Sequence, residues 1–244
     1  MNRRNFLKLV GAGLTAVAIS PSCVRKVLYT PVGEGPMFHP YEIVQLVDAQ
    51  GNPIRAGKLK KEQNYVFNYP YISTPCILIN LPEPAVGEVR LRSEDGEEYL
   101  WRNGAGKEGT VVAYSGICAH QLSYIRKDVS FLRYVPRSGN TTAFSRGGVI
   151  VCAAHNSVYD PAVGAKNLAG EAQQPLAAIV LEHRGDDTLW AVGVLGPELF
   201  HRFFKEFRKE LRKQFGDTQA ARAPVTGTTV VVPMEEYSQA ILDL

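Results

Sequence analysis

The chain has 244 residues, a formal net charge of +3 at pH 7, 45% hydrophobic residues and 21% charged residues. A chain of this length and apolar content can bury a hydrophobic core, so bulk disorder is excluded. The net charge is too small to support binding to nucleic acid through an extended basic surface.

The N-terminus has the pattern of an export signal. Arg3 and Arg4 precede an apolar run over residues 9–19, and together they resemble a twin-arginine signal. The run suits a signal peptide better than a membrane-spanning helix, which needs about 20 apolar residues. Residues 1–24 are therefore predicted to direct the folded part to the periplasmic side of the cytoplasmic membrane. The segment is then retained as an anchor, cleaved, or lipidated at Cys23, and the sequence leaves these alternatives open.

The stretch after the signal is predicted to be a linker followed by a β domain. Residues 25–40 contain three prolines and two glycines, a composition typical of linkers. From Tyr41 on, short β-branched and aromatic runs alternate with turn residues, which predicts an antiparallel sandwich or barrel. The expected strands are Glu42–Val47, Tyr65–Asn68, Ile77–Asn80, Val89–Arg92, Glu98–Arg102 and Thr110–Tyr114.

Two short stretches downstream each combine a cysteine with a histidine. One residue separates Cys118 from His120, and two residues separate Cys152 from His155. Two sulfurs and two nitrogens can hold one tetrahedral zinc ion. They can also hold a two-iron, two-sulfide cluster in which two histidines replace two cysteines on one iron. The ligand types alone are compatible with both a zinc site and an iron–sulfur site.

The residues around these pairs resemble the two ligand loops of Rieske iron–sulfur proteins. Ser157 and Tyr159 follow the second histidine at the offsets of that family, and residues 170–176 resemble part of its cluster-covering loop. The resemblance extends over about residues 111–194. It implies a mainly β chain with a Rieske-type antiparallel sandwich or barrel over residues 41–196, bearing cluster-binding loops.

The resemblance also implies a role for each site residue and a [2Fe-2S] cluster as the cofactor. The two cysteines are expected to bind the buried iron, and the two histidines the outer iron through Nδ1. The serine and the tyrosine are expected to donate hydrogen bonds to a bridging sulfide and to a cysteine sulfur, which raises the reduction potential. Outside this motif they would be a turn serine and a core aromatic. The site residues implied are Cys118, His120, Cys152, His155, Ser157 and Tyr159.

The sequence departs from the quinol-oxidising members of that family in three places. The positions of their loop-bridging disulfide are Ser123 and Ala154 here, so that bridge cannot form. Asn156 stands where a glycine is usual, and it is expected to adopt the same left-handed backbone. The stretch between the ligand pairs is long, so residues 121–150 are interpreted as an insertion. Three interpretations of this insertion are open: it braces the ligand loops, it docks a partner, or it forms a surface hairpin.

The remaining cysteines and histidines are not expected to carry chemistry. With two cysteines assigned as ligands, only Cys23 and Cys76 are left, which gives no disulfide framework. Cys76 is expected to be a small buried apolar residue. The other histidines, expected to be structural or on the surface, are His39, His183 and His201.

The C-terminal part is predicted to contain a hairpin, a helix and a tail. Ala177–Arg184 and Thr188–Val194 are the expected hairpin strands. Pro197–Phe215 is expected to be one amphipathic helix, apolar on one stripe and strongly basic elsewhere. It either packs on the β domain or docks a partner subunit or an anionic membrane. Gly216–Thr228 is expected to be a linker, and Thr229–Pro233 a last strand.

These patterns predict a one-electron carrier, a subunit of an exported or membrane-bound oxidoreductase and not catalytic alone. The electron-transfer chain in which it acts is expected to be of the quinol–cytochrome bc type or arsenite-oxidase-like. The expected redox partner is a cytochrome, a molybdenum subunit or quinol. The alternatives are a structural zinc module and a ferredoxin-like component of an oxygenase system. A terminal oxygenase is disfavoured because its mononuclear iron needs two histidines, and only His201 follows Val194. The predicted segments are 1–24, 25–40, 41–196 and a partner-docking 197–244.

Overall fold

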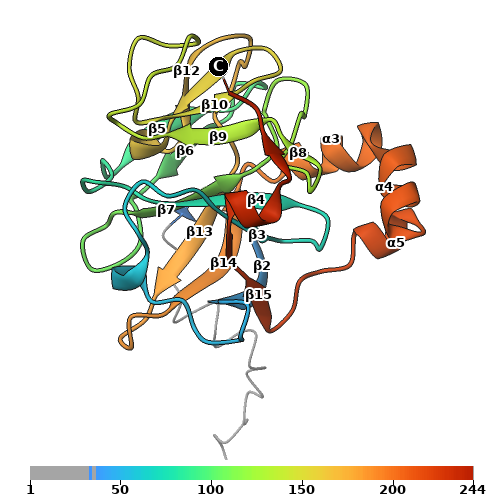
Figure 1. The fold of residues 1–244 in the computed structure, drawn as a ribbon, viewed down its shortest axis with the longest axis horizontal. Helices are drawn as coiled ribbons and strands as arrows, with labels where there is room; N and C mark the ends of the chain where they lie inside the picture. The colour runs from blue at the N-terminus through green and yellow to red at the C-terminus, as the bar shows by residue number, and fades with distance from the viewer. Residues whose placement is uncertain (1–32, 35–36, 244) are drawn as a thin grey trace, which may run out of the picture. The chain divides into compact units, whose positions relative to one another are not determined.

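The structure, a computed structural model, describes residues 33–34 and 37–243, and these are mainly β-strands (Figure 1). The predicted signal or anchor at residues 1–24, and the first part of the predicted linker, lie outside the described residues. Within the described ranges, no helix combines the length and the apolar character needed to cross a membrane.

The largest sheet has eight strands in the order β15-β2-β14-β13-β7-β4-β3-β16. Only one residue, Val231, separates its two end strands in the sequence, so the edges of the sheet come together in a nearly closed barrel. All neighbouring pairs are antiparallel except β15 with β2. The strands are β2 (Phe38–Val47), β3 (Tyr65–Asn68), β4 (Pro75–Asn80), β7 (Val111–Ser115), β13 (Ala178–His183), β14 (Leu189–Leu195), β15 (Thr228–Val230) and β16 (Val232–Pro233).

A second, four-stranded antiparallel sheet carries the later ligand loop. Its order is β12-β11-β10-β9, and valines from three of its strands form a separate small core. The strands are β9 (Leu132–Val135), β10 (Val149–Cys152), β11 (Ser157–Asp160) and β12 (Lys166–Ala169). The smaller sheets are β1-β6-β5 and β17-β8, made of β1 (Gly33–Glu34), β5 (Val89–Arg92), β6 (Glu98–Trp101), β8 (Val129–Ser130) and β17 (Ala240–Ile241).

The predicted mainly β class is confirmed, and β3 and β5 have the predicted bounds. The linker prediction is wrong at its end, because β2 begins at Phe38. Pro40 is tolerated in this strand because β15 pairs with β2 only from Gln45 on. Pro40 therefore faces a single neighbouring strand, opposite Gly193, and its missing N–H leaves no gap in a central ladder.

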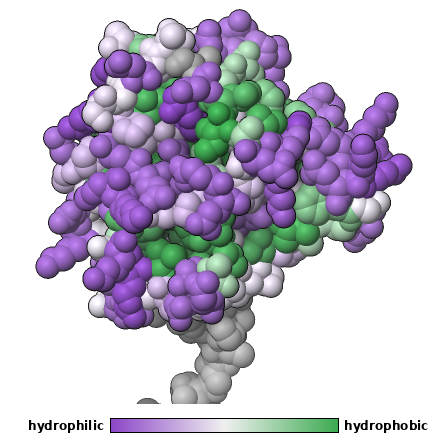
Figure 2. All heavy atoms as spheres, viewed as in Figure 1, coloured by the Kyte–Doolittle hydropathy of each residue, from purple (hydrophilic) through white to green (hydrophobic). Residues whose placement is uncertain are grey.

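The predicted single helix is two helices, α3 (Glu198–Glu206) and α4 (Arg208–Phe215), broken at Phe207, where φ is −92° and ψ is 19°. The predicted linker after it contains a third helix, α5 (Thr218–Ala221), whose N-cap is a carboxylate. Most of the apolar stripe is covered by the protein: Phe200 and Phe203 are 0% exposed, while Phe207 and Phe215 are partly buried. The helix therefore packs on the β domain, and hydrophilic residues cover most of the outer side of this segment (Figure 2).

The C-terminal tail adds strands to the barrel and also pairs with a strand of the insertion. The predicted last strand is β15 and β16, and both pair with strands of this same chain. A short helix, α6 (Met234–Tyr237), follows, and β17 then pairs in parallel with β8. The sequence predicted neither of these last two elements. The C-terminal end is thereby tied to the stretch that separates the two ligand pairs.

Replacing Phe203 by alanine is expected to lower the free energy of unfolding by about 3–5 kcal/mol, because a buried phenylalanine is removed from a packed site. The ring lies 5.0 Å from that of Tyr124 and 5.8 Å from that of Phe204, centre to centre. Urea denaturation of the purified chain, followed by circular dichroism, measures the loss. Lys209→Ala, on the exposed side of α4, is the control and should change stability by less than about 0.5 kcal/mol. Equal effects of the two variants would contradict the packing of α3.

Candidate metal centre

The two motif cysteines lie side by side in the interior. Cys118 follows β7 and is 2% exposed, while Cys152 ends β10 and is 0% exposed. A hydrogen bond from the Cys152 thiol lowers the pKa of Cys118 to about 6, and the same bond and burial raise the pKa of Cys152. The N–H groups of Ala154 and His155 oppose that rise by donating to the Cys152 sulfur. The site therefore brings two sulfurs together and surrounds them with donors that favour thiolate.

The two motif histidines lie together on the solvent side of this pair. Their ring centres are 4.9 Å apart and their planes are nearly perpendicular, at 86°. His155 is exposed, whereas the His120 side chain is 17% exposed. His120 Nε2 lies 3.2 Å from a carboxylate oxygen of Glu171. Its Nδ1 is buried and has no hydrogen-bond partner in the described part of the chain, which leaves that nitrogen available to a metal.

Tyr159 is aimed at the sulfur of Cys118. Its hydroxyl oxygen lies 3.2 Å from Cys118 Sγ and accepts a hydrogen bond from the N–H of Ala119, also at 3.2 Å. Because the Ala119 amide donates to the tyrosine oxygen, that oxygen acts as an acceptor there. The phenolic proton is therefore free to donate to the sulfur. Burial and the neighbouring Cys118 raise the pKa of Tyr159 well above its usual value. The phenol is therefore a lasting hydrogen-bond donor.

Ser157 is a second buried donor, and its partner is not supplied by the protein. The residue is 0% exposed, and its Oγ has no hydrogen-bond partner among the described residues. The hydroxyl is still near enough to Cys118 to help lower the pKa of that thiol. A buried hydroxyl without an acceptor costs free energy. An acceptor brought by a bound group would remove this cost.

The turn that carries His155 depends on two unusual backbone positions. Cys152 and Ser157 are paired across β10 and β11, so the ligand loop is the hairpin between them. Asn156 has a φ of 56°, which confirms the predicted left-handed backbone. Gly170 has a φ of 78°, and a Cβ there would lie 2.2 Å from the Asn156 carbonyl oxygen. Only glycine lets this third loop cross so closely, and the crossing brings Glu171 to His120.

The insertion braces the second ligand loop. Its strand β9 lies along β10, with Leu132 opposite Cys152. The N–H of Ala153 donates to the carbonyl of Phe131 at 2.8 Å. Leu132 and Tyr134 are almost fully buried, whereas Ser138 and Asn140 at the tip between β9 and β10 are exposed, so the strands of this hairpin belong to the interior and only its tip lies on the surface. The sequence signal for this role was the aromatic content of the insertion.

The C-terminal helices brace the first ligand loop. The Tyr124 ring lies 5.0 Å from that of Phe203 and 5.3 Å from that of Phe207. Its hydroxyl donates to the Glu210 carboxylate at 2.7 Å. Arg202 on α3 donates to the carbonyl of His120 at 3.4 Å. The apolar stripe of the helix is evident in the sequence, but no local pattern identifies the loop that covers it.

The remaining cysteine and histidines in the described ranges have other partners. Cys76 is 0% exposed, as predicted, and its thiol donates to the carbonyl of Tyr69 at 3.0 Å. Among the described residues, no group of three or more histidine, cysteine or acidic side chains is placed to hold a single metal ion. The other histidine contacts are His39 with the Tyr41 ring, His183 with Asp187 and His201 with Glu198.

Comparison with known proteins agrees with this arrangement. Residues 83–179 match the sequence profile of the Rieske [2Fe-2S] domain. The chain carries a Rieske [2Fe-2S] domain. The match includes both ligand loops and the loop of Glu171, so the cofactor of this domain is a [2Fe-2S] cluster. The chain is also 26% identical over 199 residues to the iodate reductase subunit IdrB of Denitromonas iodatirespirans, covering 80% of this chain and 82% of that protein.

Two solved structures are similar to part of this chain. One is the soluble domain of the Rieske protein II (soxF) of Sulfolobus acidocaldarius, at 21% identity and a TM-score of 0.45, covering 63% of this chain and 78% of that one. The other is the ferredoxin of carbazole 1,9a-dioxygenase from Nocardioides aromaticivorans IC177. It has 14% identity and a TM-score of 0.35, covering 62% of this chain and 96% of that one.

The residues of the site fit a [2Fe-2S] cluster. Two adjacent buried sulfurs face one side of the site, and two imidazoles form a separate pair on its outer side. The buried Nδ1 of His120 and the buried hydroxyl of Ser157 are both unpartnered within the described chain. A nitrogen ligand to iron and a donor to a sulfide are the two functions that such atoms would serve.

Replacing Tyr159 by phenylalanine is expected to lower the midpoint potential by several tens of mV. The hydrogen bond stabilises negative charge on the Cys118 sulfur, and that charge grows on reduction. About 60 mV corresponds to a tenfold change in the equilibrium constant of a one-electron couple. Redox titration followed by visible circular dichroism measures the shift. Tyr99→Phe, buried and outside the site, is the control, and an unchanged potential in Tyr159→Phe would refute the role.

Replacing Glu171 by glutamine is expected to raise the midpoint potential by roughly 20–40 mV at low ionic strength. The carboxylate beside His120 favours the oxidised, more positive state, so its neutralisation favours reduction. Because Glu171 is 65% exposed, the difference should shrink as salt is added. Titrations in low and high salt test both points. Glu235→Gln, at an exposed carboxylate on α6, should leave the potential unchanged.

Proposed function

We propose that this chain is a one-electron carrier that acts as a subunit of an exported or membrane-bound oxidoreductase. The observation that carries the proposal is the division of the site into two buried sulfurs and two outward imidazoles, one of them exposed. In the proposal Cys118 and Cys152 bind the inner iron, and His120 and His155 bind the outer iron. When bound there, the [2Fe-2S] cluster supplies one-electron oxidation and reduction.

The side chains around the cluster have separate roles in tuning the potential and in contacting a partner. Tyr159 and Ser157 donate hydrogen bonds from the buried side, which stabilises added negative charge and favours a higher potential. Glu171 covers the outer nitrogen of His120. His155 has its ring exposed, so it offers the edge through which a redox partner makes contact. The protein alone provides no further catalytic group in this proposal.

The relative named as an iodate reductase subunit supports a partner subunit for this chain as well. We propose an arsenite-oxidase-like arrangement, in which the chain passes electrons between a catalytic molybdenum subunit and a cytochrome. Ser123 and Ala154 exclude the loop-bridging disulfide of the quinol-oxidising type, which favours this arrangement over a cytochrome bc-type one. Export to the periplasmic side, with or without a retained anchor, is proposed from the Arg3–Arg4 signal pattern alone.

Electron paramagnetic resonance on the reduced, purified protein tests the function. A rhombic signal with an average g near about 1.9, together with two irons per chain, is expected from mixed histidine and cysteine ligation. Cys152→Ser should abolish the signal, whereas Cys76→Ser, at a buried cysteine outside the site, should retain it. A colourless protein with one zinc per chain would instead establish the structural zinc module and refute electron transfer.

A further inference from the structure

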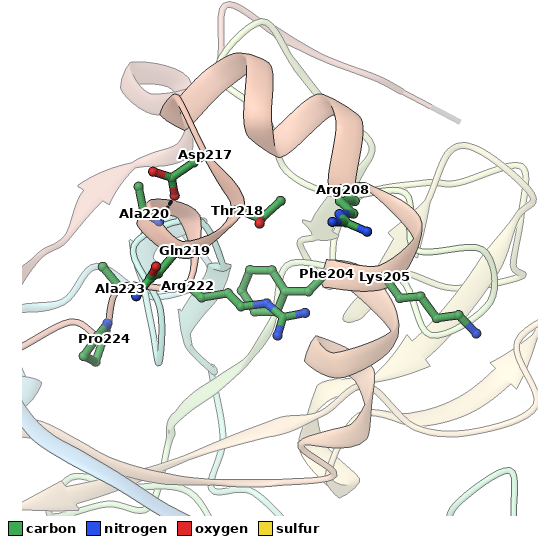
Figure 3. Close-up of a pocket in the computed structure, with 10 residues that line it drawn as sticks. All are labelled: Phe204, Lys205, Arg208, Asp217, Thr218, Gln219, Ala220, Arg222, Ala223 and Pro224. Carbon is green, nitrogen blue, oxygen red and sulfur yellow. Dashed lines mark hydrogen bonds between the residues drawn. The ribbon is translucent and has the colours of Figure 1, made fainter.

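A basic groove lies between α3, α4 and α5, on the outer side of the C-terminal segment. Its volume is about 1050 Å³. Figure 3 shows Arg222 reaching across from the α5 side to lie along Phe204, with Arg208 nearby at the start of α4. The residues that line the groove are Phe204, Lys205, Arg208, Asp217, Thr218, Gln219, Ala220, Arg222, Ala223 and Pro224.

The charges of the basic groove are not balanced by the protein. Three of the lining residues are cationic and one is anionic. The single carboxylate, Asp217, is already used as the N-cap of α5, where it accepts from the N–H of Ala220 at 2.6 Å. In the described part of the chain, no ion pair involves Lys205, Arg208 or Arg222. The groove therefore presents unpaired positive charge in a concave site.

One of these cations is held in place before any ligand binds. The Arg222 guanidinium lies 4.6 Å from the centre of the Phe204 ring, within the range of a cation–π contact. Phe204 is itself 3% exposed and fixed in the core. A side chain held in this way loses less conformational entropy on binding than a free one. This preorganisation distinguishes the groove from an ordinary solvated basic face.

Three candidate ligands of the basic groove can be compared by charge and shape: the N-terminal segment of this chain, a membrane surface and an acidic protein segment. Residues 1–32 carry five basic and no acidic side chains, so this segment of the same chain is not complementary to the groove. A membrane-surface helix needs an exposed apolar face, but Phe200, Phe203 and Phe204 are all buried. An acidic protein segment matches both the positive charge and the concave shape.

We propose that the basic groove is a docking site for an acidic segment of the partner subunit. This inference rests on the proposed function for the existence of that partner. The helix that forms one wall also carries Arg202, which donates to the carbonyl of His120. The same helix packs through Phe203 on Tyr124 of the first ligand loop. A partner bound in the groove therefore contacts α3, the helix that positions the first ligand loop.

Fluorescence anisotropy with a labelled decaglutamate peptide tests the groove on the full-length protein containing its cluster. Saturable binding at low salt is expected, with no binding of an uncharged Gly–Ser peptide of equal length. Lys205→Gln/Arg208→Gln, which leaves the Arg222–Phe204 contact intact, should weaken binding by about fivefold or more. The matched control, Lys209→Gln/Lys213→Gln, removes two exposed charges outside the groove and should weaken it by less than about twofold.

Each other outcome overturns the docking site in a different way. Equal weakening by the two double variants would mean diffuse attraction to a basic helix and not a groove. Binding to phosphatidylcholine vesicles with a quarter of phosphatidylglycerol, without binding to the peptide, would make a membrane the occupant. Self-association that the groove variant abolishes would make a second copy the occupant. The visible spectrum of the same samples reports on the cluster separately, so a protein without a cluster that still binds the peptide would refute the proposed function alone.

Discussion

Two buried sulfurs on separate loops must stay beside each other, and no disulfide can join those loops because Ser123 and Ala154 occupy the bridging positions. The chain meets this constraint with packing. Strand β9 fixes the loop of Cys152 through main-chain hydrogen bonds. Phe203 and Phe207 fix the loop of Cys118 through Tyr124. Burial of one phenylalanine is worth about 3–5 kcal/mol on truncation, which is comparable with the roughly 2–4 kcal/mol of a disulfide.

The same site combines two electrostatic influences of opposite sign. Tyr159 donates toward Cys118 from the interior, and the buried hydroxyl of Ser157 would donate to a bound cluster; both favour the reduced state, while Glu171 lies outside and favours the oxidised state. A hydrogen bond to a charged group inside a protein contributes about 1.5–3 kcal/mol. An exposed ion pair contributes at most about 1 kcal/mol. By these magnitudes the interior donors outweigh Glu171 in their effect on the midpoint potential.

The C-terminal helical segment connects the site to the surface. Its inner side covers the ligand loop with apolar rings, and its outer side holds unpaired cations around the basic groove. The break at Phe207 separates α3 from α4 and places that ring against Tyr124. One segment thus serves both loop packing and, in our proposal, partner recognition. Substitutions in it have to be assigned to one side or the other before their effect on electron transfer is interpreted.

The sequence by itself determined the β class, the bounds of β3 and β5, the two cysteine–histidine pairs and the left-handed turn at Asn156. These follow from local causes: side-chain alternation, the ligand chemistry of cysteine and histidine, and the backbone freedom of asparagine. Tertiary structure alone decided three features: the closure of the barrel by β15 and β16, the burial of β9, and the contact of Glu171 with His120. Each of these depends on contacts between segments far apart in the chain. No local pattern of residues specifies which distant strand, loop or ring will cover another.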